Sequence, residues 1–319
     1  MVLLSLAPKL LASVDILGSR ALCRRVPLYF KRCPYSSQHS GSLDLSFQSH
    51  DSTSPATPDM DHPPILIMHG LLGSKSNWNS LSKSIHLKTK RKVTDVKVIN
   101  IDARNHGDSP HSEQMDYDVM AQDVIKLIAD LKQSKVTLMG HSMGGKTMMM
   151  VALNNPRLVS SLVVVDIAPC TRPRAASDIP GLLDALAGVR VTSGRSQWAV
   201  RKEADGQLER AIPDKYLRQF LLTNLVEEAG VVRWRVNLPV LQRSLPRLAA
   251  FPRPPTATYE GPTLFVGGQN SNYIEPSAQD EIRALFPAAR FIWIPDAGHW
   301  VHSEQPARFL EAVCPFLAS

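Results

Sequence analysis

Ser142 is the side chain with the clearest potential for nucleophilic chemistry. It lies in a G-x-S-x-G sequence at 140–144, after a short apolar run at 135–139 and before the helix-forming residues 146–153. Small residues beside the serine suit a sharp turn between a strand and a helix, which strains the backbone and exposes the hydroxyl. Glycine and serine are also common in ordinary turns, so the motif alone leaves a plain turn as an equal alternative.

A serine nucleophile needs a base to accept its proton, and the base needs an acid to orient it. Two histidines follow the motif, His299 and His302. His299 directly follows an apolar run at 291–294 in a Gly-His loop, so it would lie at the carboxyl edge of a parallel sheet, where Ser142 also stands. We predict that His299 is the base and that His302 lies on the following turn. The alternative for His299 is an ordinary surface loop.

Two backbone N–H groups must converge where an oxyanion develops during acyl transfer. The Met143 amide follows the nucleophile at the start of a helix, whose N-terminus adds a partial positive charge. The Leu71 amide follows His69-Gly70 on a loop after another apolar run. We predict that Leu71 and Met143 form the oxyanion hole, the alternative being that residues 69–70 form an ordinary turn.

The elements that must position these residues alternate between apolar strands and amphipathic helices. Such alternation predicts an α/β fold with a mainly parallel central sheet and helices on both faces. The predicted strands are 43–47 at an edge and 64–68, 96–101, 135–139, 161–165, 262–268 and 291–294 inside the sheet, with helices at 117–132, 277–285 and 306–317.

The pattern changes between residues 171 and 255, where no buried strand is evident and prolines and glycines interrupt helical segments. We predict that residues 171–255 form a helical cap inserted into the sheet domain. The first part of the core would then comprise residues 43–170, and the second part residues 256–319.

Residues 1–35 have the composition of a mitochondrial transit peptide. The first 32 residues hold six Lys or Arg and one Asp, and they are rich in Leu and Ser. This segment carries most of the chain's net positive charge of +7. The net charge therefore does not indicate a nucleic-acid-binding surface. A secretory signal is the alternative, although Pro8 and Lys9 interrupt its apolar run. No window of about 18 apolar residues predicts a transmembrane segment. We therefore expect a mitochondrial, matrix protein.

The chain resembles the alpha/beta-hydrolase superfamily over about residues 43–319. The resemblance rests on H-G-L-L-G at 69–73, D-A-R-N-H-G-D-S at 102–109, G-H-S-M-G-G at 140–145 and the late G-H at 298–299. Finer motifs resemble the subfamily of bacterial YbfF-type esterases and alpha/beta-hydrolase-domain protein 11. They are R-N-H-G-D-S-P at 104–110, V-D-I-A-P at 165–169, R-Q-F-L-L-T-N-L at 218–225, W-R-V-N-L at 234–238 and A-G-H-W at 297–300.

The acid of the triad has several candidates in the sequence. In most of the superfamily it follows the strand that matches residues 263–266, but the loop here has no carboxylate and carries Ser271. The resemblance to the bacterial subfamily implies that Asp166, at the end of the preceding strand, is the acid. A capping aspartate is its alternative role, and Glu275 and Asp296 are weaker candidates.

A second polar loop carries Asp102, Arg104, His106 and Asp108, and His69 precedes it in the chain. The resemblance implies that this loop is structural and ties neighbouring loops together. His69 and His106 lack the ligand spacing of a metal site. We therefore expect neither a metal nor an organic cofactor.

The resemblance implies a serine hydrolase that cleaves acyl esters, with diacylglycerol or a related acylglycerol as leading substrate. A thioesterase, cofactor-free haloperoxidase-like chemistry and a non-catalytic module that binds a ligand or protein remain alternatives. Apolar segments at 148–150, 220–222 and 238–241 could line an acyl pocket, although core packing explains each equally well. A partner protein in the matrix also stays open.

Overall fold

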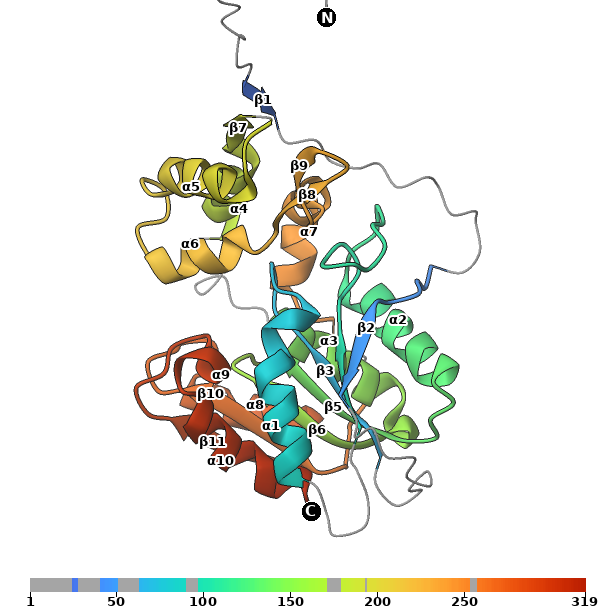
Figure 1. Cartoon of the computed structure of the whole chain (residues 1–319). Helices are drawn as coiled ribbons and strands as arrows, with labels where there is room; N and C mark the ends of the chain where they lie inside the picture. The colour runs from blue at the N-terminus through green and yellow to red at the C-terminus, as the bar shows by residue number, and fades with distance from the viewer. Residues whose placement is uncertain are drawn as a thin grey trace, which may run out of the picture.

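The computed structural model describes residues 25–27, 41–50, 63–89, 97–170, 179–192, 194–252 and 257–319. A seven-stranded sheet of order β11-β10-β6-β5-β3-β4-β2 lies at the centre of the molecule (Figure 1). Its strands are β2 (Phe47–His50), β3 (Ile65–Met68), β4 (Val98–Ile101), β5 (Val136–His141), β6 (Val159–Val165), β10 (Thr263–Gly268) and β11 (Ala289–Ile294). Only β2 is antiparallel to its neighbour, which confirms the mainly parallel sheet.

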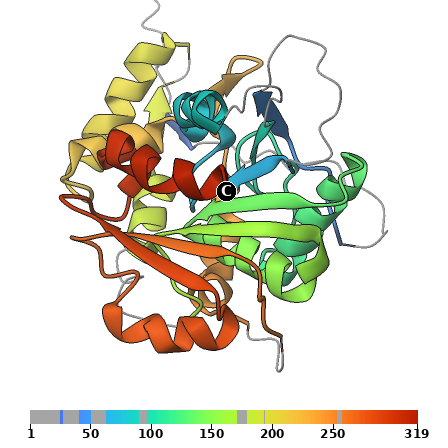
Figure 2. The same ribbon diagram turned by 90° about the horizontal axis from the view of Figure 1, so that it is seen from below.

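Helices cover both faces of the sheet, as Figure 2 shows from below. Alternate side chains of β3 belong to different cores: Ile65 and Ile67 to one, Leu66 and Met68 to the other. The first core includes side chains of α1 (Asn79–Thr89) and α10 (Pro306–Leu317); the second includes side chains of α2 (Tyr117–Asp130), α3 (Met143–Asn154) and α8 (Gln279–Leu285). Burial on both faces explains why the inner strands are continuous apolar runs.

The predicted and observed elements differ at two places in the core. The edge strand β2 begins at Phe47, whereas the sequence pattern predicted 43–47. Helix α1 was not predicted, because its serines and lysines obscure an apolar face made by Leu81 and Ile85. Three short 3-10 helices, η1 (Lys75–Trp78), η2 (Pro156–Leu158) and η3 (Pro276–Ala278), and helix α9 (Val301–Glu304) complete the core.

The chain between β6 and β10 forms a separate layer beyond the carboxyl ends of the sheet strands (Figure 1). It contains α4 (Ile179–Gly188), β7 (Arg190–Thr192), α5 (Gln197–Leu208), α6 (Lys215–Leu222), β8 (Leu225–Glu228), β9 (Val231–Trp234) and α7 (Leu238–Ala249). Here called the cap, this layer is not purely helical, because β8 and β9 form an antiparallel hairpin. The hairpin is joined to α4 by the buried Trp234, whose Nε1–H donates to the Leu186 carbonyl at 3.0 Å.

Of the predicted leader at 1–35, the structure describes only β1 (Arg25–Pro27), which pairs antiparallel with β7. Most of the leader, and the predicted start of the cap at 171–178, lie outside the described residues. Within the described ranges, no helix has both the length and the apolar composition needed to cross a membrane.

Candidate active site

Ser142 occupies the turn between β5 and α3. Its φ of 51° lies in the left-handed region, and its N–H donates to the Val165 carbonyl at 3.0 Å. Glycine is required on both sides of this turn: a Cβ on Gly140 would lie 2.3 Å from the Gly144 carbonyl oxygen, and one on Gly144 would lie 2.5 Å from that of Met68. The strained backbone and the close packing therefore explain the G-x-S-x-G sequence.

His299 lies on the loop between β11 and α9, as its place after a strand predicted. Its Nε2 is 3.1 Å from the Ser142 hydroxyl oxygen, across 157 residues of sequence. The loop is held by His141, whose Nε2–H donates to the His299 carbonyl at 2.9 Å. Burial lowers the pKa of His141, so this second imidazole stays neutral. Among the described residues, His299 alone has a ring nitrogen within hydrogen-bond distance of the Ser142 hydroxyl.

Asp166 directly follows β6 and is fully buried. Its Oδ2 accepts a hydrogen bond from Nδ1 of His299 at 2.7 Å, while its Oδ1 accepts from the Gly268 amide at 3.0 Å. The Ser271 hydroxyl also donates to Oδ2, at 2.5 Å. These three donors hold the carboxylate in one orientation. This arrangement fixes the proton of His299 on Nδ1 and leaves the Nε2 lone pair facing Ser142.

The other acid-loop candidates lie elsewhere. Asp296 pairs with Arg308 at 3.0 Å, and the Glu275 carboxylate accepts a hydrogen bond from the Ser277 hydroxyl at 3.2 Å. Ser271 stands at the position where most of the superfamily would carry the acid, and here it donates to the acid of the neighbouring strand. Among the described residues, Asp166 is the carboxylate that contacts His299.

The amides of Leu71 and Met143 are both suited to receive an oxyanion. Within the described ranges neither amide has a hydrogen-bond acceptor, and Met143 begins α3. The next amide, that of Leu72, donates to Nε2 of His106 at 3.1 Å. This bond, together with the φ of 62° at Leu72, fixes the loop so that the Leu71 amide remains available.

The second polar loop holds the backbone together. The buried Asp102 accepts hydrogen bonds from the Lys75 ammonium at 2.6 Å and the Asp108 amide at 2.8 Å. Nε2 of His69 accepts from the Ala103 amide at 3.1 Å.

His69 and His106 each form hydrogen bonds to the backbone with both ring nitrogens. Nδ1–H of His69 donates to the Gly70 carbonyl at 2.7 Å, and Nδ1–H of His106 donates to that of Arg104 at 3.0 Å. Burial lowers the pKa of both rings, that of His106 to about 3. Neutral rings with no free nitrogen cannot serve as bases, and no cluster of potential metal ligands occurs in the described part of the chain.

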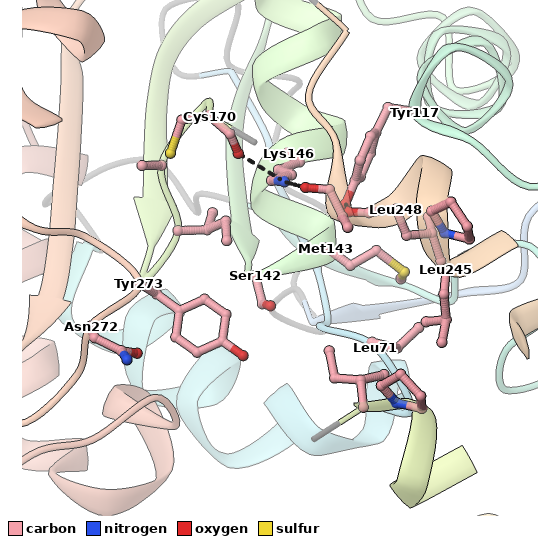
Figure 3. Close-up of a pocket in the computed structure, with 16 residues that line it drawn as sticks. Leu71, Tyr117, Ser142, Met143, Lys146, Cys170, Leu245, Leu248, Asn272 and Tyr273 are labelled. Atoms are coloured by element: carbon pink, nitrogen blue, oxygen red, sulfur yellow. Dashed lines mark hydrogen bonds between the residues drawn. The ribbon is translucent and has the colours of Figure 1, made fainter. Parts of the chain in front are cut away.

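A cavity of about 260 Å³ opens beside Ser142 between the core and the cap (Figure 3). Most of its walls are apolar, with Leu71, Met143 and Ile167 from the core and Leu245 and Leu248 from α7. The segments proposed from sequence as pocket walls are not among the lining residues. The side chains at 148–150, for example, are buried in the core cluster, because periodicity cannot distinguish a helix face packed on the sheet from one that faces a cavity.

Tyr273 and Lys146 are among the lining residues that the sequence analysis missed. Tyr273 stacks on the imidazole of His299, with ring centroids 3.8 Å apart and an interplanar angle of 18°. Lys146 lies one helical turn after Ser142, and its ammonium is buried at the cavity wall. No sequence signal marks Tyr273, but a lysine in an otherwise apolar helix was a signal that could have been read.

Comparisons with known proteins agree with this geometry. The family described as alpha/beta hydrolase fold matches residues 63–306. The sn-1-specific diacylglycerol lipase ABHD11 of Mus musculus is 43% identical over 297 residues, covering 92% of each chain. Esterase YbfF of Escherichia coli is 34% identical, covering 81% of this chain and 94% of its own. A solved marine microorganism esterase has a TM-score of 0.76 and 33% identity, covering 86% of this chain and all of its own.

The family match covers most of the chain, and the relatives align along nearly their whole lengths. These comparisons confirm the predicted resemblance to alpha/beta hydrolases, and together with the parallel sheet they confirm the predicted fold. The chain belongs to the alpha/beta-hydrolase family, and it is an ester hydrolase.

Proposed function

We propose that this enzyme hydrolyses acyl esters of glycerol, with diacylglycerol as the leading substrate, through an acyl-Ser142 intermediate. The observation that carries the mechanism is the continuous set of short contacts from Ser142 through His299 to Asp166. The apolar cavity beside the serine, and the name of the 43% identical mouse relative, support a lipid ester as substrate.

The geometry supports acyl transfer in two halves. Ser142 Oγ forms a bond to the ester carbon while its proton passes to Nε2 of His299, and the carbonyl electron pair moves onto oxygen. The Leu71 and Met143 amides stabilise that oxyanion. When the oxyanion collapses, the alcohol leaves with the proton from Nε2. Water then repeats the sequence on the acyl-enzyme and releases the fatty acid.

Asp166 has an electrostatic role in this proposal. As His299 accepts the proton its ring becomes positively charged, and the buried carboxylate 2.7 Å away stabilises that charge. The Gly268 amide and Ser271 hydroxyl hold the carboxylate in place, so little reorganisation is needed during the reaction.

The mechanism is tested with a fluorophosphonate probe on the purified chain. The wild type should be labelled, and Ser142→Ala should abolish labelling and lower kcat by about 10⁴-fold or more. Ser277→Ala, at an exposed serine outside the cavity, is the matched control and should label normally. Labelling that survives in Ser142→Ala would refute the mechanism.

The substrate is tested by a panel of diacylglycerols, monoacylglycerols, short esters and acyl-thioesters. We expect the highest kcat/KM for a diacylglycerol. A higher value for thioesters would replace the proposed substrate class and leave the triad intact. Probe labelling without turnover of any of these compounds would support the alternative of a ligand-binding module.

We also propose that the enzyme acts in the mitochondrial matrix, on the basis of the arginine-rich composition at 1–35. Residues 1–40 fused to a fluorescent protein should direct it to the matrix. The same fusion with Arg20, Arg24, Arg25 and Arg32 changed to Gln should remain in the cytosol. Secretion of the first fusion would contradict the proposal.

A further inference from the structure

Lys146 places a buried ammonium group in the wall of the cavity. The residue is 4% exposed, and no carboxylate pairs with it within the described part of the chain. Its Nζ instead donates to three backbone carbonyls, those of Cys170 at 3.4 Å, Ala249 at 2.9 Å and Ala250 at 3.1 Å. A buried charge without a counter-ion is costly, so this lysine calls for a specific explanation.

The three carbonyls belong to the two segments where the chain passes between the core and the cap. Cys170 follows β6 on the way into the cap, and Ala249 and Ala250 lie at the end of α7 on the way back. Lys146 therefore joins both crossing segments to α3, the helix that begins at the nucleophile. Figure 3 shows its ammonium between Cys170 and Leu248.

The same two segments form much of the cavity wall. Ile167 and Ala168 line it before the first crossing, and Leu245 and Leu248 line it before the second. The second segment is held further by Tyr117, whose hydroxyl donates to the Leu248 carbonyl at 2.7 Å and whose ring lies 5.5 Å from the Lys146 ammonium. Movement of either segment would thus change the width of the cavity.

Only a lysine side chain can donate hydrogen bonds to all three carbonyls from a single nitrogen atom. An ammonium group carries three donors on one nitrogen, which matches three carbonyls that converge from different segments. An apolar side chain of the same length would fill the space but would leave the carbonyls unpaired in a buried environment. The segments would then separate to let water reach those oxygens.

We propose that Lys146 is a specificity-determining residue that sets the width of the acyl cavity by tying both crossing segments of the cap to α3. The inference rests on the proposed function, in which the cavity holds the acyl chain. Within the described residues, the Lys146 ammonium forms no hydrogen bond with a triad side chain or an oxyanion amide, so its influence should grow with the length of acyl chain in the cavity.

The test compares Lys146→Met with the wild type on p-nitrophenyl acetate, butyrate and octanoate. For acetate we expect kcat/KM within about twofold, because the short acyl group makes few contacts with the crossing segments. For octanoate we expect KM to rise about tenfold with kcat nearly unchanged, since binding along the whole chain is lost. Lys146→Arg keeps the charge and several donors, and it should restore part of the preference for octanoate.

Two controls separate this role from general loss of stability. Met149→Ala removes a buried side chain on the same helix that does not line the cavity, and it should leave the chain-length profile unchanged. Inactivation by short-chain and long-chain alkyl fluorophosphonates repeats the comparison without turnover. There Lys146→Met should slow only the long-chain reagent.

Two results would overturn the inference. One is an unchanged chain-length profile in Lys146→Met, and the other is an equal loss for acetate and octanoate. Failure of the proposed acyl-Ser142 mechanism gives a different result, because the wild type itself would then hydrolyse none of the esters.

Discussion

Two groups of aspartate and histidine side chains follow the carboxyl ends of strands in the same sheet. The reactive group consists of Ser142, His299 and Asp166, and the loop-holding group consists of His69, Asp102 and His106. In the loop-holding group, both nitrogens of each ring bond to backbone atoms. In the reactive group, His299 bonds to a carboxylate at one nitrogen and faces a hydroxyl at the other.

The difference shows that residue type does not distinguish a reactive histidine from a structural one. Burial lowers the pKa of the loop-holding rings, and their bonds to the backbone leave no lone pair for a substrate. His299 is partly exposed and its Nε2 faces Ser142 beside the cavity, so it can take the serine proton and pass it to the leaving alcohol. Changes in the reactive group should therefore affect catalysis, and changes in the loop-holding group should affect stability.

The largest effect is expected for Asp166→Asn. The amide can donate to Nδ1 of His299, which would favour the tautomer that carries its proton on Nε2 and cannot accept one from Ser142. We expect kcat/KM to fall by about 10³–10⁴-fold with little loss of folded protein. Ester hydrolysis within tenfold of the wild type would mean that Asp166 is not the acid, and Glu275 and Asp296 would then be tested.

Asp102→Asn is the matched change in the loop-holding group. It breaks the contact with the Lys75 ammonium and leaves that charge without one of its two carboxylate partners. We expect the free energy of unfolding, measured in urea, to fall by about 3 kcal/mol. The kcat/KM of the remaining folded enzyme should stay within about threefold of the wild type. A catalytic loss as large as that of Asp166→Asn would remove the distinction between the groups.

The sequence could predict the parts of this site that local chemistry determines. Ser142 sits in a turn that only small neighbours permit, and His299 follows a strand in a short loop, so pattern alone identified both residues. Asp166 was different, since only resemblance to a subfamily suggested it. The contact between its carboxylate and His299 spans 133 residues and depends on the order of β6, β10 and β11 in the sheet.

What the sequence could not supply is the direction in which side chains face. The methionines at 148–150 were read as possible cavity walls, but α3 turns them toward the core. The roles of Tyr273 and Lys146 depend on contacts with distant segments, and no spacing in the sequence reports such contacts. The strands β7, β8 and β9 of the cap were missed because each has only three or four residues.

His302 offers a smaller test, because it is a buried histidine that belongs to neither group. It stacks on Trp78 at 4.3 Å, and within the described residues its Nδ1 has no hydrogen-bond partner. Burial lowers the pKa of His302 to about 3. In the unfolded chain the histidine pKa is near 6.5, so below that pH the unfolded chain binds a proton that the folded protein does not bind. The free energy of unfolding therefore decreases as the pH falls from about 6.5 toward 3.

His302→Phe should reduce this acid sensitivity. Between pH 7 and pH 5 the wild type should lose about 2 kcal/mol more unfolding free energy than the variant, because 1.5 pH units below an unshifted pKa correspond to about that much. The measurement is urea unfolding of both proteins at the two pH values. Equal losses would show that the His302 ring is able to take up a proton in the folded protein.

The smallest effect is expected for substitutions of Tyr273. They test whether an aromatic side chain assists Ser142, His299 and Asp166 in catalysis. The stacked ring covers one face of His299 and is positioned by its own amide, which donates to the Ser271 oxygen at 3.3 Å. Contact with an aromatic face stabilises a positively charged imidazole by about 1 kcal/mol. Tyr273→Leu should therefore lower kcat on a short ester about fivefold, whereas Tyr273→Phe keeps the ring and should stay within twofold.

The two variants separate the stacked ring from its hydroxyl, because Tyr273→Phe retains the ring over His299 and Tyr273→Leu removes it. Among the aromatic rings of the described residues, those of His69 and His106 contact only each other, tilted and 5.1 Å apart. Both imidazoles are neutral and need no such stabilisation. The same kcat loss in Tyr273→Phe as in Tyr273→Leu would instead assign the effect to the hydroxyl.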